Sequence, residues 1–182
     1  MGEKRQARQG ADVLLQEEPL RFQTRKQVGL LGGNFNPVHL AHLVMADQVQ
    51  NQLGLDKVYL MPTYLPPHVD EKKTISSEHR LAMLELAVAD NPCLDIEPIE
   101  LIRKGKSYTY DTMKALKEAN PDTDYYFIIG GDMVEYLPKW HRIDDLLHLV
   151  QFVGIRGPNY PTESTYPIIW VDVPQMAISS TL

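Results

Sequence analysis

Two histidines three residues apart, His39 and His42, follow two glycines and a proline in the segment Gly32-Gly33-Asn34-Phe35-Asn36-Pro37-Val38-His39-Leu40-Ala41-His42. In the first turn of a helix, residues at i and i+3 lie on one face, so both imidazoles would sit side by side. The N–H groups and the dipole at a helix start favour an anion, and glycines allow its close approach. The spacing therefore predicts a phosphate-binding corner in which both imidazoles donate hydrogen bonds to phosphate oxygens.

A metal site is the alternative interpretation of this histidine pair, because histidines at i and i+3 also occur in metal sites. Zinc needs further ligands, and the single cysteine, Cys93, lies in an apparent strand. Beside Leu94 and Ile96, this cysteine is typical of a small core residue rather than of a nucleophile. We therefore predict no protein metal site at His39 and His42.

The elements that must position this corner alternate along the chain. An apolar run at 28–31 predicts a buried strand, and Asn36-Pro37 predicts the N-cap and first residue of a helix over 37–53. Similar patterns predict strands at 57–62, 94–97 continuing over 98–101, 125–129, 151–155 and 167–173. They predict helices at 78–90 after a Ser77 cap, 110–119 after a Thr109 cap, 133–137 and 143–149. In the helix over 78–90, the expected core residues are Leu81, Leu84, Leu86 and Val88.

This alternation, with continuous apolar strands, predicts an α/β fold: a Rossmann-like, doubly wound parallel sheet with helices on both faces. Ligands of such sheets bind beyond the carboxyl ends of the strands. The glycine turn after the first strand and Gly130-Gly131-Asp132 after the fourth both fall at that edge. Residues 1–25 carry charges and glutamines with little periodicity, so we expect a flexible N-terminal extension before one domain over 26–182.

Charge and cysteine usage exclude several classes of protein. The formal net charge of −6 argues against a general nucleic-acid or membrane-surface binder. No apolar run is long enough to span a bilayer, and the N-terminus lacks the apolar core of a secretory signal. A single cysteine excludes an internal disulfide and fits a reducing compartment. We expect a cytoplasmic protein with no nucleic-acid or membrane partner; its oligomeric state, a homo-oligomer included, stays open.

The segment around His39 and His42 resembles the G-G-x-F-x-P-x-H-x-x-H element of the nucleotidyltransferase superfamily. Ile178-Ser179-Ser180-Thr181 resembles the start of its second element, I-S-S-T-x-x-R. A similar string at 75–80, which ends at Arg80, precedes a predicted helix and is interpreted as a helix cap, with Arg80 as a secondary candidate. The functional element is therefore assigned to 178–181, and its arginine and the family's C-terminal helix would lie beyond Leu182.

The middle of the chain resembles the bacterial nicotinate mononucleotide adenylyltransferases, through Ser107-Tyr108-Thr109-Tyr110-Asp111-Thr112, Gly130-Gly131-Asp132 and Pro138-Lys139-Trp140. The resemblance implies an enzyme of NAD biosynthesis that joins ATP, with Mg²⁺, to nicotinate mononucleotide, giving deamido-NAD and pyrophosphate. It implies catalytic roles for His39 and His42. The ATP contacts that it implies are Gly32, Gly33, Phe35, His39, His42, Gly130, Asp132, Ile178, Ser179, Ser180 and Thr181. The implied mononucleotide contacts are Asn34, Tyr108, Thr109 and Trp140.

The chemistry of these residues agrees with the resemblance but leaves alternatives open. Amides at a helix start near Thr109 suit a carboxylate, and the face of Trp140 suits a cationic ring. By itself, Trp140 could equally be a surface-to-core aromatic, and Asp132 could be a helix cap. Another acceptor (nicotinamide mononucleotide, phosphopantetheine or a flavin nucleotide) and a non-catalytic nucleotide-binding domain are the rival interpretations.

Overall fold

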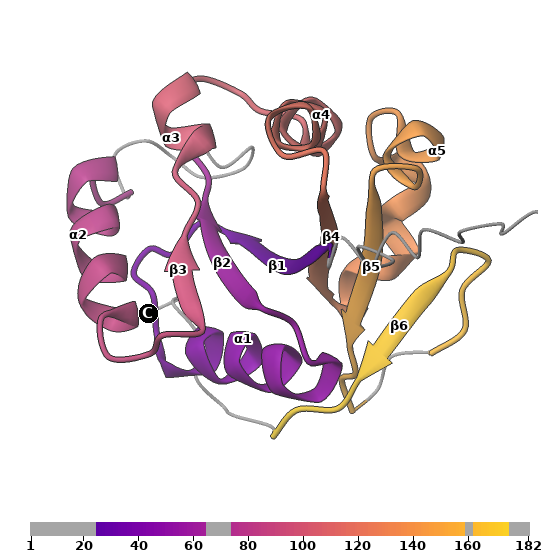
Figure 1. Cartoon of the computed structure of the whole chain (residues 1–182), viewed down its shortest axis with the longest axis horizontal. Coiled ribbons are helices and arrows are strands. Elements are labelled where there is room, and N and C mark those ends of the chain that lie inside the picture. Colours follow the sequence, from indigo (N-terminus) through magenta and orange to yellow (C-terminus); the bar gives the residue numbers. More distant parts are fainter. Residues whose placement is uncertain (1–24, 65–73, 159–161, 175–182) are drawn as a thin grey trace, which may run out of the picture.

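The structure, a computed structural model, describes residues 25–64, 74–158 and 162–174 (Figure 1). Within these ranges, one sheet of parallel strands has the order β3-β2-β1-β4-β5-β6. The strands are β1 (Lys26–Gly33), β2 (Lys57–Pro62), β3 (Leu94–Ile96), β4 (Thr123–Gly130), β5 (Val150–Ile155) and β6 (Ile168–Val171). This order confirms the predicted doubly wound sheet, because β1 and β4 are neighbours at the point where the strand order reverses.

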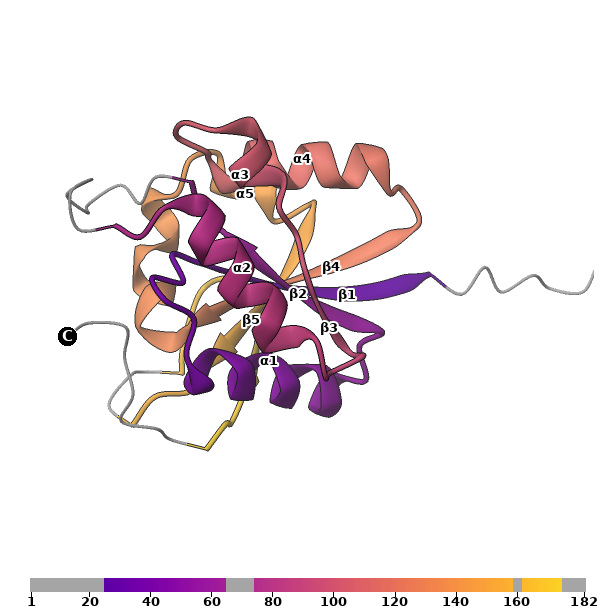
Figure 2. The same cartoon turned by 90° about the vertical axis from the view of Figure 1, so that its left-hand side faces the viewer.

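Helices cover both faces of the sheet (Figure 2). Helices α1 (Leu40–Leu53) and α2 (Ser77–Val88) pack on one face. Helix α3 (Ile99–Arg103), α4 (Thr109–Ala119), the 3₁₀ helix η2 (Gly131–Lys139) and α5 (Ile143–Leu146) lie on the other. None of the helices described here is long and apolar enough to cross a membrane.

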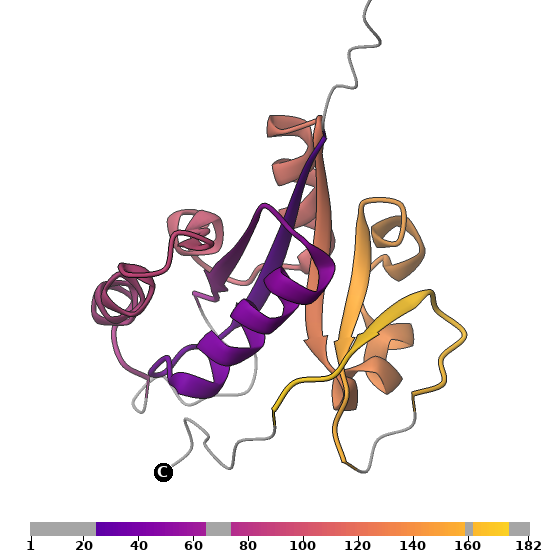
Figure 3. The ribbon, with the colours of Figure 1, turned by 60° about the horizontal axis from the view of Figure 1, so that its bottom comes forward.

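Two hydrophobic cores, one on each face, explain why the inner positions of the strands are apolar. Successive side chains of a strand point to opposite faces. Leu30 of β1 accordingly packs with Phe127 and Phe152 in one core, and Leu31 packs with Ile128 in the other. Since both faces are buried, the inner positions of the central strands are apolar or glycine, and polar residues such as Asp124 and Gln151 lie near the strand starts. The carboxyl ends of β4 and β5 lie on the side of the molecule where α1 begins (Figure 3).

The predicted start of the first helix is wrong. Helix α1 begins at Leu40 with His39 as its N-cap, not at Pro37 with Asn36 as the cap. The reason is a contact from outside the segment: the backbone N–H of Ile75 donates to Asn36 Oδ1 at 2.9 Å. The amide oxygen of Asn36 therefore ties two loops together instead of capping a helix. The predicted C-terminal glycine is confirmed, since Gly54 adopts the left-handed conformation there.

Several further local predictions differ from the structure. Residues 98–101 do not continue a strand, because β3 ends at Ile96 and α3 follows; here Glu100 is buried and accepts a hydrogen bond from the Thr112 hydroxyl of α4. The N-caps of α2 and α4 are Ser76 and Tyr108, each one residue earlier than predicted. Leu86 is 79% exposed and Leu81 is only partly buried, so neither belongs to the buried core, whereas Leu84 and Val88 are buried as expected.

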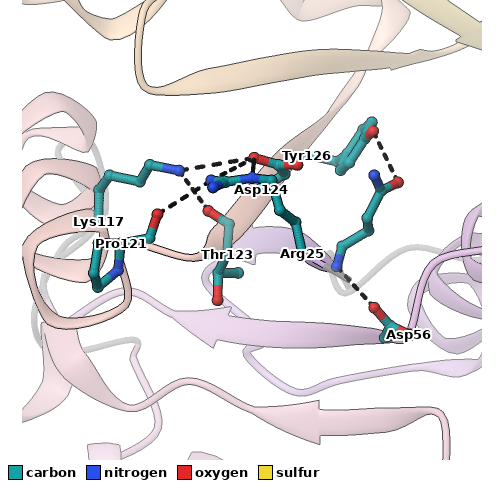
Figure 4. Close-up of polar contacts among 8 residues, drawn as sticks. Arg25, Asp56, Lys117, Pro121, Thr123, Asp124 and Tyr126 are labelled. Atoms are coloured by element: carbon teal, nitrogen blue, oxygen red, sulfur yellow. Dashed lines mark hydrogen bonds and ion pairs between the residues drawn. The ribbon is translucent and has the colours of Figure 1, made fainter. Parts of the chain in front are cut away.

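Polar contacts close the amino-terminal edge of the sheet, opposite the strand ends just described (Figure 4). Arg25, which directly precedes β1, donates through Nε to Asp124 Oδ1 of β4 at 3.0 Å. Lys117 of α4 lies 3.9 Å from the same carboxylate oxygen. These exposed pairs contribute little stability each, but they join β1, β4 and α4 at an edge that carries none of the predicted site residues.

Candidate active site

The turn after β1 is built on a buried phenylalanine. Phe35 is 2% exposed and has a φ of 46°, in the left-handed region. A Cβ placed on Gly33 would lie 3.3 Å from the Phe35 ring, so glycine fits this position closely. The ring of His42 meets the Phe35 ring edge-on, with centroids 4.9 Å apart. Phe35, which was predicted to contact ATP, thus packs against both Gly33 and His42.

His39 and His42 lie together at the N-terminus of α1, as their spacing predicts. Their rings are stacked, with centroids 3.8 Å apart and planes 19° from parallel. The backbone N–H of His39 donates to His42 Nδ1 at 3.2 Å. The first turn of α1 carries no acidic residue that would compete with an anion for the helix dipole, and the His42 N–H donates to His39 O at 3.0 Å.

The hydrogen bond to His42 sets its tautomer. Because Nδ1 accepts, the proton of the neutral ring is on Nε2, which leaves Nε2–H as the donor. Burial and the charge of His39 lower the pKa of His42 to about 4, and burial lowers the pKa of His39 as well. At pH 7, before phosphate binds, His42 is therefore a neutral hydrogen-bond donor.

The second glycine turn, after β4, lies beside the first because β1 and β4 are paired. Asp132, in η2, directly follows these glycines and is exposed. A Cβ on Gly130 would lie 2.5 Å from Asp132 Oδ1. A Cβ on Gly131 would lie 2.6 Å from the carbonyl oxygen of Ile155 in β5. Close packing of η2 against the end of β5 therefore requires glycine at Gly131, whereas at Gly130 the exposed Asp132 side chain could move aside.

Gly131→Ala should therefore destabilise the protein by about 1–3 kcal/mol, because a backbone oxygen cannot move aside cheaply. Urea unfolding measures the loss. Gly32→Ala is the matched control, since its Cβ would have an ordinary contact 3.6 Å from the Phe127 ring. Equal losses in the two variants would show that the contact with Ile155 does not limit this position.

A third group of predicted residues lies around the start of α4. Tyr108, its N-cap, is 41% exposed, and its ring lies 4.3 Å from the ring of His141, measured between centroids. Lys106 Nζ is 4.9 Å from the Tyr108 ring centroid. The structure thus brings Tyr108 and Thr109 to the residue that follows Trp140. The sequence analysis did not single out His141, although it directly follows Trp140.

Trp140 is half-buried and belongs partly to the core. It meets Phe127 and Phe152 edge-on, with centroids 6.0 and 5.8 Å apart. The surface-to-core interpretation of this side chain is confirmed. Its proposed contact with a pyridine ring stays a prediction.

The second half of the predicted site, Ile178 to Thr181, lies outside the described residues. The last residues before it can be placed: Val173 and Pro174 line a pocket with Ala41 and Met45 of α1. Arg156 lines the same pocket from the end of β5. The chain that leads to Ile178 therefore reaches the helix that carries the histidines. No cluster of three or more metal-ligating side chains occurs among the residues placed in the structure.

A doubly wound parallel sheet with a histidine-bearing helix start at its switch point defines the class of the protein: an α/β nucleotide-binding protein of the nucleotidyltransferase type. A family model described as cytidylyltransferase-like matches residues 30–182. The chain belongs to this family.

Individual relatives and one solved structure are similar to this chain over most of its length. A protein of Streptococcus pneumoniae named "Probable nicotinate-nucleotide adenylyltransferase" is 66% identical over 166 residues, which are 91% of this chain and 79% of that protein. A Lactococcus lactis protein of the same name is 65% identical over 158 residues, or 87% of this chain and 81% of the relative. In fold, the chain is similar to Plasmodium falciparum nicotinic acid mononucleotide adenylyltransferase complexed with NaAD, with a TM-score of 0.71 at 18% identity, covering 86% of this chain and 81% of that one.

Proposed function

We propose that this protein is a nicotinate-nucleotide adenylyltransferase, a transferase that joins ATP and nicotinate mononucleotide to give deamido-NAD and pyrophosphate. The observation that carries the proposal is the stacked pair His39 and His42 at the N-terminus of α1, beside the turn that ends at Gly33. The names of relatives 65–66% identical to this chain support the choice of acceptor. The reaction is a step of NAD biosynthesis.

The chemistry needs no covalent intermediate and no general base. The phosphate of the mononucleotide is already an anionic nucleophile at neutral pH, and it attacks the α-phosphorus of ATP in line. Catalysis then consists of holding two anions in position and neutralising the charge that develops. His42 is proposed to donate from Nε2–H to the ATP phosphates beside the first turn of α1, and Gly32 and Gly33, which have no side chains, allow the phosphates to approach closely.

Mg²⁺ enters with ATP and supplies positive charge on its phosphates. Oxygen ligands suit this ion, and it commonly keeps its waters and binds mainly through substrate phosphates. Ser179, Ser180 and Thr181 are proposed to add hydroxyl and amide donors to the same phosphates, and Asp132 is proposed to accept hydrogen bonds from the ribose.

The nicotinate end is proposed to bind at the start of α4. Backbone amides near Tyr108 and Thr109 suit its carboxylate, because the N–H groups of a first helical turn have no partner within the helix. Trp140 offers an indole face to the pyridinium ring. Asn34 is proposed to contact the mononucleotide from the turn after β1.

A panel of acceptors with ATP, scored by pyrophosphate release, tests this function. Nicotinate mononucleotide should have a kcat/KM about 10²-fold or more above that of nicotinamide mononucleotide. The reason is that the backbone amides near Thr109 would accommodate a carboxylate, and the carboxamide of nicotinamide does not offer them the same two acceptor oxygens. Phosphopantetheine and flavin mononucleotide should give no turnover. Equal use of the two pyridine nucleotides would contradict the assignment of the acceptor. ATP binding without pyrophosphate release from any acceptor would contradict the enzyme itself.

A further inference from the structure

Arg80, on the first turn of α2, is among the most deeply buried side chains, although it is charged. It is 1% exposed and has no carboxylate partner among the residues described. Its planar guanidinium has five N–H donors in a fixed fork. Six oxygens lie within hydrogen-bonding distance of them: Ile75 O at 3.1 Å, Asn34 O at 2.8 Å, Asn34 Oδ1 at 3.5 Å, Thr63 O at 2.7 Å, Tyr64 O at 3.2 Å and Ser77 Oγ at 3.1 Å.

These contacts join three segments that are distant in sequence. Asn34 follows β1, and Thr63 and Tyr64 follow β2, whose last residue is paired with Gly33. The remaining oxygens belong to residues at the start of α2. Arg80 Nη1 lies between Asn34 and Thr63, so a single nitrogen links the chain leaving two neighbouring strands at the carboxyl edge of the sheet.

Stability alone is a poor reason for this arrangement. A buried cation loses its hydration, and an apolar core residue of similar size often stabilises a fold at least as well. Burial accordingly lowers the pKa of Arg80, although the group stays charged. Three of the oxygens are backbone carbonyls of the two turns, which an apolar side chain would leave without donors. What Arg80 supplies uniquely is the relative position of those turns.

We propose that Arg80 is a positioning residue for the mononucleotide side of the site, which it serves by holding Asn34 and the Thr63–Tyr64 turn in one fixed geometry. The proposal rests on the proposed function, which assigns Asn34 to the acceptor. The ATP phosphates instead bind at Gly32, Gly33 and the start of α1. His39 and His42 have no hydrogen bond to Arg80 among the described contacts.

Arg80→Lys is the main variant, because lysine keeps the charge but offers three donors from one point in place of a planar fork. We expect KM for nicotinate mononucleotide to rise about tenfold or more, since a displacement of about 1 Å in a positioning group has large kinetic effects. KM for ATP should change less than about threefold, because the start of α1, with His39 and His42, has no hydrogen bond to Arg80 among the described contacts.

A matched pair of serines keeps the test informative if Arg80→Lys does not fold. Ser77→Ala removes one acceptor of the guanidinium, whereas Ser76→Ala removes the N-cap oxygen that accepts from the His79 N–H. Ser77→Ala should raise KM for the mononucleotide about twofold to threefold relative to KM for ATP. Ser76→Ala should lower thermal stability and leave the ratio of the two KM values unchanged.

Leu84→Ala controls for general loosening of α2. Leu84 lies one turn further along the same helix, is fully buried and belongs to the hydrophobic core. If Leu84→Ala shifts the two KM values as Arg80→Lys does, or if Arg80→Lys raises both KM values equally, the positioning role is overturned.

Failure of the proposed function gives a different result. If the wild-type protein uses another mononucleotide, the acceptor panel reveals it, and the KM ratio of acceptor to ATP is then measured with that mononucleotide. A rise in this ratio in Arg80→Lys and Ser77→Ala, but in neither control, supports the proposal whichever acceptor is used. An unchanged ratio in both variants rejects it.

Discussion

His42→Ala should lower kcat about 10²–10³-fold, the usual loss when one well-placed donor to transition-state charge is removed. The physical reason is the fixed tautomer: the His39 N–H occupies Nδ1, so Nε2–H is a preorganised donor that needs no rearrangement during the reaction. The fold should survive, because His42 is only partly buried and its ring contacts are with Phe35 and His39. Steady-state pyrophosphate release, with circular dichroism as the check on folding, measures the effect.

His42→Gln is the informative partner of this variant. Glutamine places a neutral N–H donor near the position of Nε2 but does not carry a charge. Because burial keeps the His42 pKa near 4, a neutral donor should replace part of the function, and His42→Gln should be about tenfold more active than His42→Ala. Activity of His42→Ala near the wild-type rate would remove this residue from the catalytic site.

Trp140→Ala should raise KM for nicotinate mononucleotide about tenfold to 10²-fold, and much more than it raises KM for ATP, if the indole stacks on the pyridinium ring. The structure also gives Trp140 a packing role, which the sequence left open. Trp140 also meets Phe127 and Phe152, so its truncation should cost about 3 kcal/mol of stability. KM must therefore be measured well below the melting temperature of the variant.

Two further variants separate the two roles of Trp140. Trp140→Phe keeps an aromatic side chain against the core and should show a smaller rise in the mononucleotide KM. Leu146→Ala removes a fully buried side chain from the same core cluster without touching Trp140's proposed ligand face, so it should lower stability alone. Equal changes in the two KM values for Trp140→Ala would identify a purely structural tryptophan.

The elements of this protein were predictable because their signals are local. The bounds of β2, Lys57–Pro62, agree with the prediction, since an apolar run meets a proline that ends it. The histidine pair was equally predictable, because a spacing of three brings two side chains together on any helix start. Alternation of strands and helices then determined the parallel sheet, and with it the edge at which both glycine turns lie.

The details that only the tertiary structure decided all depend on contacts between distant segments. The start of α1 is set by a hydrogen bond from Ile75 to Asn36, and α3 replaces a strand where Glu100 meets Thr112. Arg80 differs most from its sequence-based interpretation. The sequence indicates that it is part of a helix cap, whereas in the structure its donors link the turns after β1 and β2. Sequence by itself predicted which residues bind a nucleotide. The tertiary structure decided which buried side chain links the turns after β1 and β2, because an arginine fork is satisfied only where several folded segments bring their oxygens to one point.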